Sequence, residues 1–161
     1  RADACVAACG AWTAPLLRTV GVDLPIYPGK GYSATFALRR PEAAPWVSTI
    51  DDAKKIAMSR LGDSLRVAGT IELSGWDLTL DSPLAQARCH MLARRIETLL
   101  PGVCDTRLPH EGGQPQFWAG LRPATPTNIP LIGATPLAGL SSTGSMWPTK
   151  RAKLPCGVLS M

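Results

Sequence analysis

The stretch Ile56-Ala-Met-Ser-Arg-Leu-Gly-Asp-Ser-Leu-Arg-Val-Ala-Gly-Thr-Ile71 decides the fold class of this chain. It contains two runs in which apolar side chains alternate with others, as in strands that bury one face. Between the runs, the segment 61–64 has the composition of a tight turn. The stretch therefore predicts an antiparallel hairpin. The apolar positions are Ile56, Met58, Leu65, Val67 and Ile71.

A helix is predicted after the hairpin. Ser82 can cap its N-terminus, Pro83 suits the first helical position, and Pro101-Gly102 ends the helix. One face is apolar and packs on a sheet, whereas the opposite face is charged and solvated. The apolar face consists of Ala85, Cys89, Leu92, Ile96 and Leu99. The charged face consists of Arg88, Arg94, Arg95 and Glu97.

Further strands are predicted on both sides of these elements. Tyr32, Ala34 and Phe36 alternate with polar residues, which indicates a strand with one solvated face. Residues 46–50, 116–120 and 130–133 are further short strands. Antiparallel strands with one or two covering helices predict an α+β fold with a mainly antiparallel sheet.

The first segment differs in character. Ala4-Cys-Val-Ala-Ala-Cys9 is an uninterrupted run of small apolar residues, typical of a parallel strand buried on both faces. Gly10 follows, and then a helix that Thr13 can cap and Gly21 can end. We expect an orphan strand–helix unit, because the sequence shows no parallel neighbour for this strand.

Composition narrows the function classes. The 161 residues, 45% hydrophobic and 18% charged, suffice for one domain with a core. Three of the basic residues behind the net charge of +5 lie in the tail, at Lys150, Arg151 and Lys153. The remaining basic pairs are scattered, which argues against nucleic-acid binding.

No apolar run approaches the roughly 20 residues of a membrane span. The chain begins with Arg1, so a segment upstream is expected.

Five cysteines without CxxC spacing argue against a disulfide framework or a zinc site. Cys5 and Cys9 are expected to be small buried hydrophobic residues in a reducing compartment. With only His90 and His110 to add, no metal site assembles, and both histidines are expected at the surface.

Three residues are candidates for function. Arg122 follows an aromatic strand and precedes Pro123, which suits bidentate binding of a carboxylate; the alternative is an ion pair with a nearby acid. Tyr32 either lines a polar pocket or is a half-buried sheet tyrosine. Lys30, between two glycines, is either a functional cation or a solvated edge charge. No G-x-G-x-x-G or P-loop motif is present.

Four ordered blocks resemble the D-amino acid dehydrogenase branch of the FAD-dependent amine oxidoreductases. They are Val6-Ala-Ala-Cys-Gly-Ala-Trp12, Leu24-Pro-Ile-Tyr-Pro-Gly-Lys-Gly-Tyr-Ser33, Arg66-Val-Ala-Gly-Thr-Ile-Glu72 and Trp118-Ala-Gly-Leu-Arg-Pro-Ala-Thr-Pro126 with Pro130-Leu-Ile-Gly133. The resemblance implies four regions. These are part of an FAD-binding domain (1–23), a substrate domain (24–117), a return segment (118–140) and a divergent basic tail (141–161).

The resemblance also implies an activity. A flavin of this kind takes a hydride from Cα of a D-amino acid such as D-alanine, and the imino acid hydrolyses to a 2-oxo acid and ammonia. The electrons pass to a quinone or another respiratory acceptor. The whole protein is expected in the cytoplasm, with peripheral association at the inner face of the cell membrane.

Site residues follow from the same resemblance. Arg122 is expected to bind the substrate carboxylate, and Tyr32 to line the substrate pocket. Gly10, Trp12 and Gly133 are expected to lie beside FAD. No side chain is expected to act as catalyst, because the flavin performs the redox chemistry.

The chain departs from the family in several places. The amino-terminal G-x-G-x-x-G unit is absent, Ser145 stands where the family has histidine, Pro148 and the tail replace a helix, and Thr127 replaces an aspartate. The 161 residues alone are therefore expected to be colourless and inactive. Two alternatives remain: a glycine- or sarcosine-type oxidase, which Lys30-Gly-Tyr-Ser33 disfavours, and a non-catalytic remnant or module.

Overall fold

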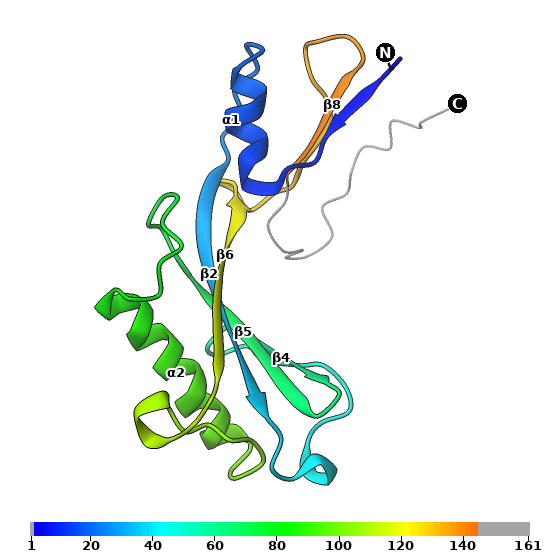
Figure 1. The fold of residues 1–161 in the computed structure, drawn as a ribbon. Coiled ribbons are helices and arrows are strands. Elements are labelled where there is room, and N and C mark those ends of the chain that lie inside the picture. Colours follow the sequence, from blue (N-terminus) through cyan, green and yellow to red (C-terminus); the bar gives the residue numbers. More distant parts are fainter. Residues whose placement is uncertain (1, 145–161) are drawn as a thin grey trace. The chain divides into compact units, whose positions relative to one another are not determined.

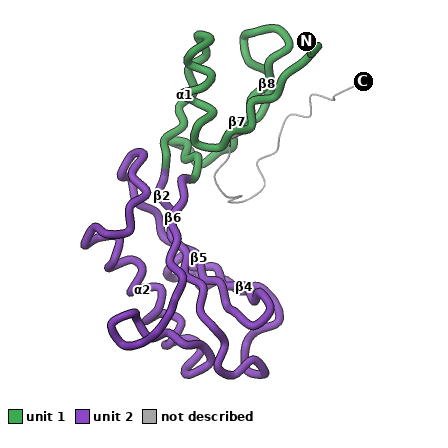
Figure 2. The backbone as a smooth tube through the Cα atoms, viewed as in Figure 1, with its two compact units in different colours: residues 1–28, 122–161 green, residues 29–121 purple. Residues whose placement is uncertain are grey.

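The computed structural model describes residues 2–144 of the chain. It divides into two compact units, one made of residues 2–28 and 122–144 and the other of residues 29–121 (Figure 2). Each unit has its own small hydrophobic core. The predicted basic tail lies outside the described residues from Ser145 onward.

The 29–121 unit is built on a five-stranded sheet with the order β3-β4-β5-β2-β6 (Figure 1). The hairpin prediction is confirmed, since β4 and β5 pair in antiparallel fashion from Ile56↔Gly69 to Leu61↔Ser64. Gly62, in the turn, has a φ of 60°, which glycine adopts without strain. The strands are β2 (Tyr27–Ala37), β3 (Thr49–Asp51), β4 (Ile56–Leu61), β5 (Ser64–Glu72) and β6 (Gln116–Ala124).

The predicted helix is α2 (Pro83–Leu99). The Ser82 hydroxyl accepts a hydrogen bond from the Ala85 amide at 3.2 Å, and Pro83 opens the first turn, as the sequence predicts. The apolar face is buried through Ile96, but Leu99 is 37% exposed, because the sheet contact ends before the last turn. The predicted α+β fold is confirmed.

One face of this sheet and the apolar face of α2 form the core (Figure 1). Side chains two residues apart on one strand point to the same face, and the buried residues follow this spacing. Burying such aliphatic and aromatic side chains contributes about 1.5–3 kcal/mol each. The fully buried members are Ala34 and Phe36 in β2, Ile56 in β4, Leu65 and Val67 in β5, and Ala85, Leu92 and Ile96 in α2.

The other unit has a three-stranded sheet with the order β1-β8-β7. Its strands are β1 (Cys5–Ala7), β7 (Leu131–Ala134) and β8 (Leu140–Gly144). A 3₁₀ turn, η1 (Gly10–Trp12), leads into the short helix α1 (Thr13–Arg18). The Thr13 hydroxyl accepts a hydrogen bond from the Cys9 amide at 3.0 Å and is fully buried.

Two expectations for the first segment are wrong. The strand is no orphan, because β1 pairs in parallel with β8, which lies more than 130 residues further along the chain. It is also not buried on both faces: Ala7 is buried, whereas Cys5 and Cys9 are exposed and Val6 is 68% exposed. Within residues 2–144, β1 is an edge strand, and only its Ala7 side packs on the small core.

Two short 3₁₀ turns, η2 (Pro41–Ala43) and η3 (Pro109–Glu111), lie in the connections of the 29–121 unit. The connection after α2 is fixed to the end of β2. Leu38 and Cys104 form an isolated antiparallel bridge, and the Asp105 amide donates to the Ala37 carbonyl at 2.8 Å.

Asp105 makes the stability of this unit sensitive to acid. Its carboxylate accepts hydrogen bonds from Arg107 at 2.9 and 2.7 Å and from Arg39 at 2.9 Å. These contacts, with that of Arg107 the largest, hold the pKa of Asp105 well below its ordinary value. A depressed pKa contributes stability above the unfolded value of about 3.9, and this stability is lost as the pH falls.

We expect the free energy of unfolding to fall below about pH 4. The contribution of Asp105 is about 1 kcal/mol, because its arginine partners are half exposed. Urea unfolding of the full chain at pH 7 and pH 3 measures it. Asp105→Asn should flatten the difference, and Asp52→Asn, at a carboxylate 87% exposed, should not. Equal pH profiles for the two variants would contradict this assignment.

Candidate active site

Arg122 lies near the end of β6, an edge strand of the five-stranded sheet. Pro123 follows it within the strand, and an edge strand tolerates the missing N–H. Trp118 and Gly120 precede Arg122 on the same strand. Because successive residues of a strand alternate between its two faces, these three residues lie on the same face. The opposite side bears Ala119, which is buried in the core.

Arg122 is partly buried. Among residues 2–144 its guanidinium has neither a hydrogen bond nor an ion pair, although an arginine side chain can donate five hydrogen bonds. The ion pair that the sequence left as an alternative for Arg122 is therefore not formed with any acid of the described chain. An arginine whose guanidinium has no partner within the described chain can bind the carboxylate of a ligand.

The segment after Arg122 forms a hydrogen-bonded turn. The Thr125 hydroxyl donates to the Ile129 carbonyl at 2.9 Å, and the Asn128 amide donates to the Thr125 carbonyl at 3.1 Å. Asn128 has a φ of 57°, a conformation that asparagine tolerates in turns. Together with Pro123, this closed turn fixes the backbone that holds Arg122.

Trp118 forms a flat surface on the side of the sheet that α2 does not cover. Its ring lies across Gly120, so that a Cβ at position 120 would overlap a carbon of the Trp118 ring. The guanidinium of Arg66 lies 5.7 Å from the centre of the ring and donates to Ser33 Oγ at 3.3 Å. Gly120 is thus required for the position of Trp118, which remains 57% exposed.

Gly10 and Trp12 occupy the 3₁₀ turn between β1 and α1. Gly10 has a φ of 58°, and no other part of the described chain lies within 4 Å of the place a Cβ would take. Such an open, left-handed glycine allows a ligand to approach the backbone closely. The side chain of Trp12 is 51% exposed. These features fit the close approach of a planar cofactor, but α1 is too short to offer a phosphate site.

Gly133 lies in β7 opposite Ser142 of the central strand β8. The structure places Gly10, Trp12, Gly133 and Arg122 in one compact unit, and Tyr32 in the other. The role of each of these residues toward substrate or cofactor stays a prediction.

Tyr32 lies in the core and is 1% exposed. Its hydroxyl donates to Glu72 Oε2. Lys30 Nζ lies 5.5 Å and Arg88 Cζ 5.8 Å from the centre of its ring. Burial first, and then the bond to the Glu72 carboxylate, raises the pKa of Tyr32 far above its ordinary value. The hydroxyl is therefore a proton donor to Glu72 at every physiological pH.

The sequence did not predict the buried polar network that Tyr32 forms with Lys30, Glu72 and Arg88. Lys30 is fully buried, which excludes a solvated edge charge; its ammonium donates to the Thr79 carbonyl at 2.5 Å and pairs with Asp77 at 3.4 Å. Arg88, expected in solvent, lies 3.6 Å from Glu72. The two glycines around Lys30 were the only signal of this burial in the sequence.

The network lies beside a bulge in the sheet. The pairing of β2 with β5 shifts between Gly31 and Tyr32, which leaves Thr70 as the extra residue. Thr70 has a φ of 60°, a strained conformation for a β-branched residue, and its buried hydroxyl has no hydrogen-bond partner among the described residues. Strain of this kind concentrates at functional sites.

Residues 2–144 contain no cluster of three or more His, Cys, Asp or Glu side chains placed to hold a metal ion. Over the same residues, no helix has the length and apolar character needed to cross a bilayer.

Comparisons with known proteins agree on one family. A family model described as FAD dependent oxidoreductase matches residues 1–147. A D-amino acid dehydrogenase of Dechloromonas aromatica (strain RCB) is 47% identical over 134 residues, which is 83% of this chain and 30% of that protein. The chain thus spans about 30% of the length of this curated relative.

Solved structures give the same picture. Iminodiacetate oxidase from Chelativorans sp. BNC1 has 26% identity and a TM-score of 0.70, over 91% of this chain and 37% of that one. Glycine oxidase from Geobacillus kaustophilus has 25% identity and a TM-score of 0.67, over 89% and 36% of the two chains.

Proposed function

Because the chain belongs to the family of FAD dependent oxidoreductases, we propose that it is part of a dehydrogenase that oxidises D-amino acids. The products are 2-oxo acids and ammonia, and D-alanine is the model substrate. The observation that supports this most is Arg122, partly buried and without an acidic partner in residues 2–144, within the block that matches the dehydrogenases.

Arg122 binds the substrate carboxylate in this proposal. A guanidinium presents two parallel N–H groups that match the two carboxylate oxygens, so the contact fixes the orientation of the substrate as well as its affinity. The turn from Thr125 to Asn128 and Pro123 hold the backbone of Arg122, which keeps this orientation the same from one turnover to the next.

FAD, when bound, supplies the acceptor for the hydride that leaves the substrate Cα. Gly10, Trp12 and Gly133 are the residues of this chain that we propose lie against it. Gly10 offers bare backbone at its open side, and Trp12 offers an exposed aromatic face. The imino acid product then hydrolyses in water to the 2-oxo acid and ammonia.

Tyr32 lies in β2, a strand that we propose belongs to the substrate side of the protein. Its hydroxyl already donates a hydrogen bond to Glu72. Its contribution is therefore to hold β2 beside the strained bulge, rather than to donate to substrate. This role differs from the pocket-lining role that the sequence predicts for Tyr32.

The electron acceptor is proposed to be a quinone or another respiratory carrier. The relatives at 40–47% identity are called dehydrogenases, a name that implies an acceptor other than oxygen. A lipid-soluble acceptor would require the whole cytoplasmic protein to meet the inner face of the membrane, as a peripheral protein.

A glycine oxidase is the second candidate, because one of the similar solved structures is such an enzyme. Its identity of 25% is far below the 47% of the dehydrogenase relative, so the dehydrogenase is better supported. The two candidates differ in substrate and in electron acceptor, and both differences can be measured.

The test uses the full-length protein loaded with FAD. We expect D-alanine to reduce an artificial dye in the absence of oxygen and to yield one pyruvate and one ammonia per two electrons. L-alanine is the matched control and should be inactive. Faster turnover of glycine, with oxygen consumed and hydrogen peroxide released, would favour the oxidase; no substrate-dependent reduction at all would favour the non-catalytic reading.

A further inference from the structure

The bulge at Thr70 exchanges the two faces of strand β5. Before the bulge, Leu65 and Val67 lie in the core. Because successive side chains of a regular strand alternate between its faces, the same period would place Ile71 in the core and Glu72 on the uncovered face. One extra residue reverses this order. The bulge therefore puts a carboxylate where the apolar pattern of the strand predicts an isoleucine.

The contacts of β5 beyond the bulge show this exchange. Glu72 lies opposite Lys30 of β2, whose side chain is fully buried, and its carboxylate accepts the hydrogen bond of Tyr32. Ile71 lies opposite Gly31 and is 38% exposed. Proteins usually bury isoleucine and expose glutamate. The opposite arrangement in β5 does not follow from the burial of apolar surface.

The chain fixes the bulge from both sides. At Gly69, a Cβ would lie only 2.8 Å from the side chain of Ile56, so the backbone before the bulge packs tightly against β4. Two residues after Thr70, the carboxylate of Glu72 is bound by Tyr32. Thr70 itself has a φ of 60°, and such strain persists only where the surrounding structure imposes it. The direction in which β5 leaves the bulge is therefore set by its neighbours.

The face that receives Ile71 also bears aromatic and basic side chains. Helix α2 covers the other face of the sheet (Figure 1). Arg66 and Trp118 lie on the uncovered face, with the guanidinium 5.7 Å from the centre of the ring. The alternation along β6 places Arg122 on the same face of that strand as Trp118. Ile71 thus adds apolar surface to the face on which β6 bears the proposed carboxylate-binding residue.

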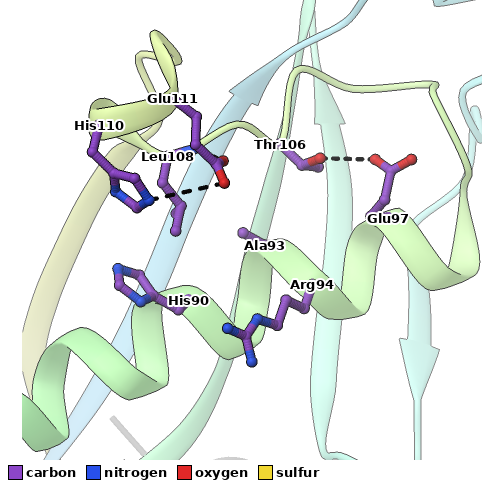
Figure 3. A pocket seen from close by; sticks show the side chains of 8 residues that line it. All are labelled: His90, Ala93, Arg94, Glu97, Thr106, Leu108, His110 and Glu111. Carbon is purple, nitrogen blue, oxygen red and sulfur yellow. Dashed lines mark hydrogen bonds and ion pairs between the residues drawn. The ribbon is translucent and has the colours of Figure 1, made fainter.

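The covered side of the sheet has a cavity, but β5 does not contribute to it. The cavity has a volume of about 300 Å³ and lies between α2 and the segment 106–111. Figure 3 shows that contacts within the chain already cross or line it, with Thr106 bonded to Glu97 and His110 paired with Glu111. Among the residues that the structure describes, none of β5 lines this cavity. The apolar side chain that the bulge turns outward is therefore available only on the uncovered face.

We propose that Ile71 is a specificity-determining residue of the proposed oxidation, and that it contacts the side chain of the D-amino acid. The inference rests on the proposed function. An apolar contact favours a hydrocarbon side chain over a charged one, because a charge buried without a partner is unfavourable. Gly31, opposite Ile71, adds no side chain of its own. D-amino acids with aliphatic side chains longer than that of alanine are the substrate class that gains from this contact.

Dye reduction with D-leucine and with D-alanine tests this contact in the FAD-loaded, full-length protein. Ile71→Ala should lower kcat/KM for D-leucine about tenfold and that for D-alanine less than about threefold, because the lost contact scales with the apolar surface of the substrate. The change should appear mainly in KM, since the contact does not alter during the reaction. Ile71→Val, which keeps most of the apolar side chain, should give an intermediate result.

Ile50→Ala is the matched control. Ile50 is 61% exposed on β3, at the edge of the same sheet and two strands away from β5, so its loss should leave the ratio of the two kcat/KM values unchanged. Binding of 4-methylpentanoate, which is leucine without its amine, gives a second readout through the flavin absorbance. Ile71→Ala should weaken it about tenfold, and weaken propionate binding less than about threefold.

The outcomes separate this inference from the proposed function. If the wild type oxidises D-alanine and Ile71→Ala keeps the wild-type ratio of kcat/KM for D-leucine and D-alanine, the role of Ile71 is overturned and the proposed oxidation stands. If the wild type oxidises neither D-amino acid, the proposed function falls and the role of Ile71 falls with it. A change of the ratio in Ile71→Ala but not in Ile50→Ala supports the contact.

Discussion

Replacing Arg122 by alanine in the full-length enzyme is expected to lower kcat/KM for D-alanine about 100- to 1,000-fold. The loss corresponds to about 3–4 kcal/mol, the range found when one partner of a desolvated charge pair is removed. Most of the loss should appear in KM, because the arginine binds a group of the substrate that does not change during the reaction. Steady-state dye reduction over a range of D-alanine concentrations measures both constants.

Arg122→Lys separates charge from geometry. Lysine keeps the positive charge but lacks the planar fork, so it should recover only part of the affinity. D-alaninamide is the matched substrate control, since it has no carboxylate: the wild-type enzyme should strongly prefer D-alanine to it, and Arg122→Ala should lose this preference. An unchanged KM for D-alanine in Arg122→Ala would mean that Arg122 is structural.

Ile56→Ala is expected to destabilise the 29–121 unit by about 2–5 kcal/mol, the range for large-to-small changes in a packed core. Ile56 is fully buried at the start of β4, where it packs in the core beneath α2. Its loss leaves a cavity in addition to the lost burial. Urea unfolding of the full chain, followed by far-ultraviolet circular dichroism, measures the change.

Ile50→Ala provides the control with the same chemistry. Ile50 lies on the neighbouring strand β3, opposite Ala57, and is 61% exposed. Its replacement should change stability by no more than about 0.5 kcal/mol. Equal losses for the two variants would contradict the side of the sheet assigned to the core.

Local signals predicted the central elements well. The alternation around Gly62 predicted the hairpin, and Ser82 with Pro83 predicted the start of α2, because both depend on residues a few positions apart. Capping and turn formation are decided within the segment itself, so sequence alone is sufficient for them.

Long-range contacts were beyond the sequence. The parallel partner of β1 is β8, and nothing near residue 5 indicates a strand at residue 140. Arg88 was expected in solvent because its helical position is opposite the apolar face. The pairing with Glu72 depends on where β5 ends relative to α2, and no local pattern states this.

The site was predicted unevenly. Arg122 came from the resemblance, since its residue type and neighbours alone favoured an ordinary ion pair. The burial of Lys30 and the contact of Tyr32 with Glu72 were not foreseen, because Glu72 lies 40 residues further along the chain. The strain at Thr70 was also hidden, since it arises from the pairing register of two strands.

Binding of propionate to the FAD-loaded, full-length protein tests the central claim most directly. Propionate has the carboxylate and carbon chain of D-alanine but no amine to oxidise, so it reports on carboxylate binding alone. Titration followed by flavin absorbance should give saturable binding to the wild type, and binding at least about 100-fold weaker to Arg122→Ala. Propionate binding that is unchanged in Arg122→Ala would contradict the assignment of Arg122 as the carboxylate-binding residue.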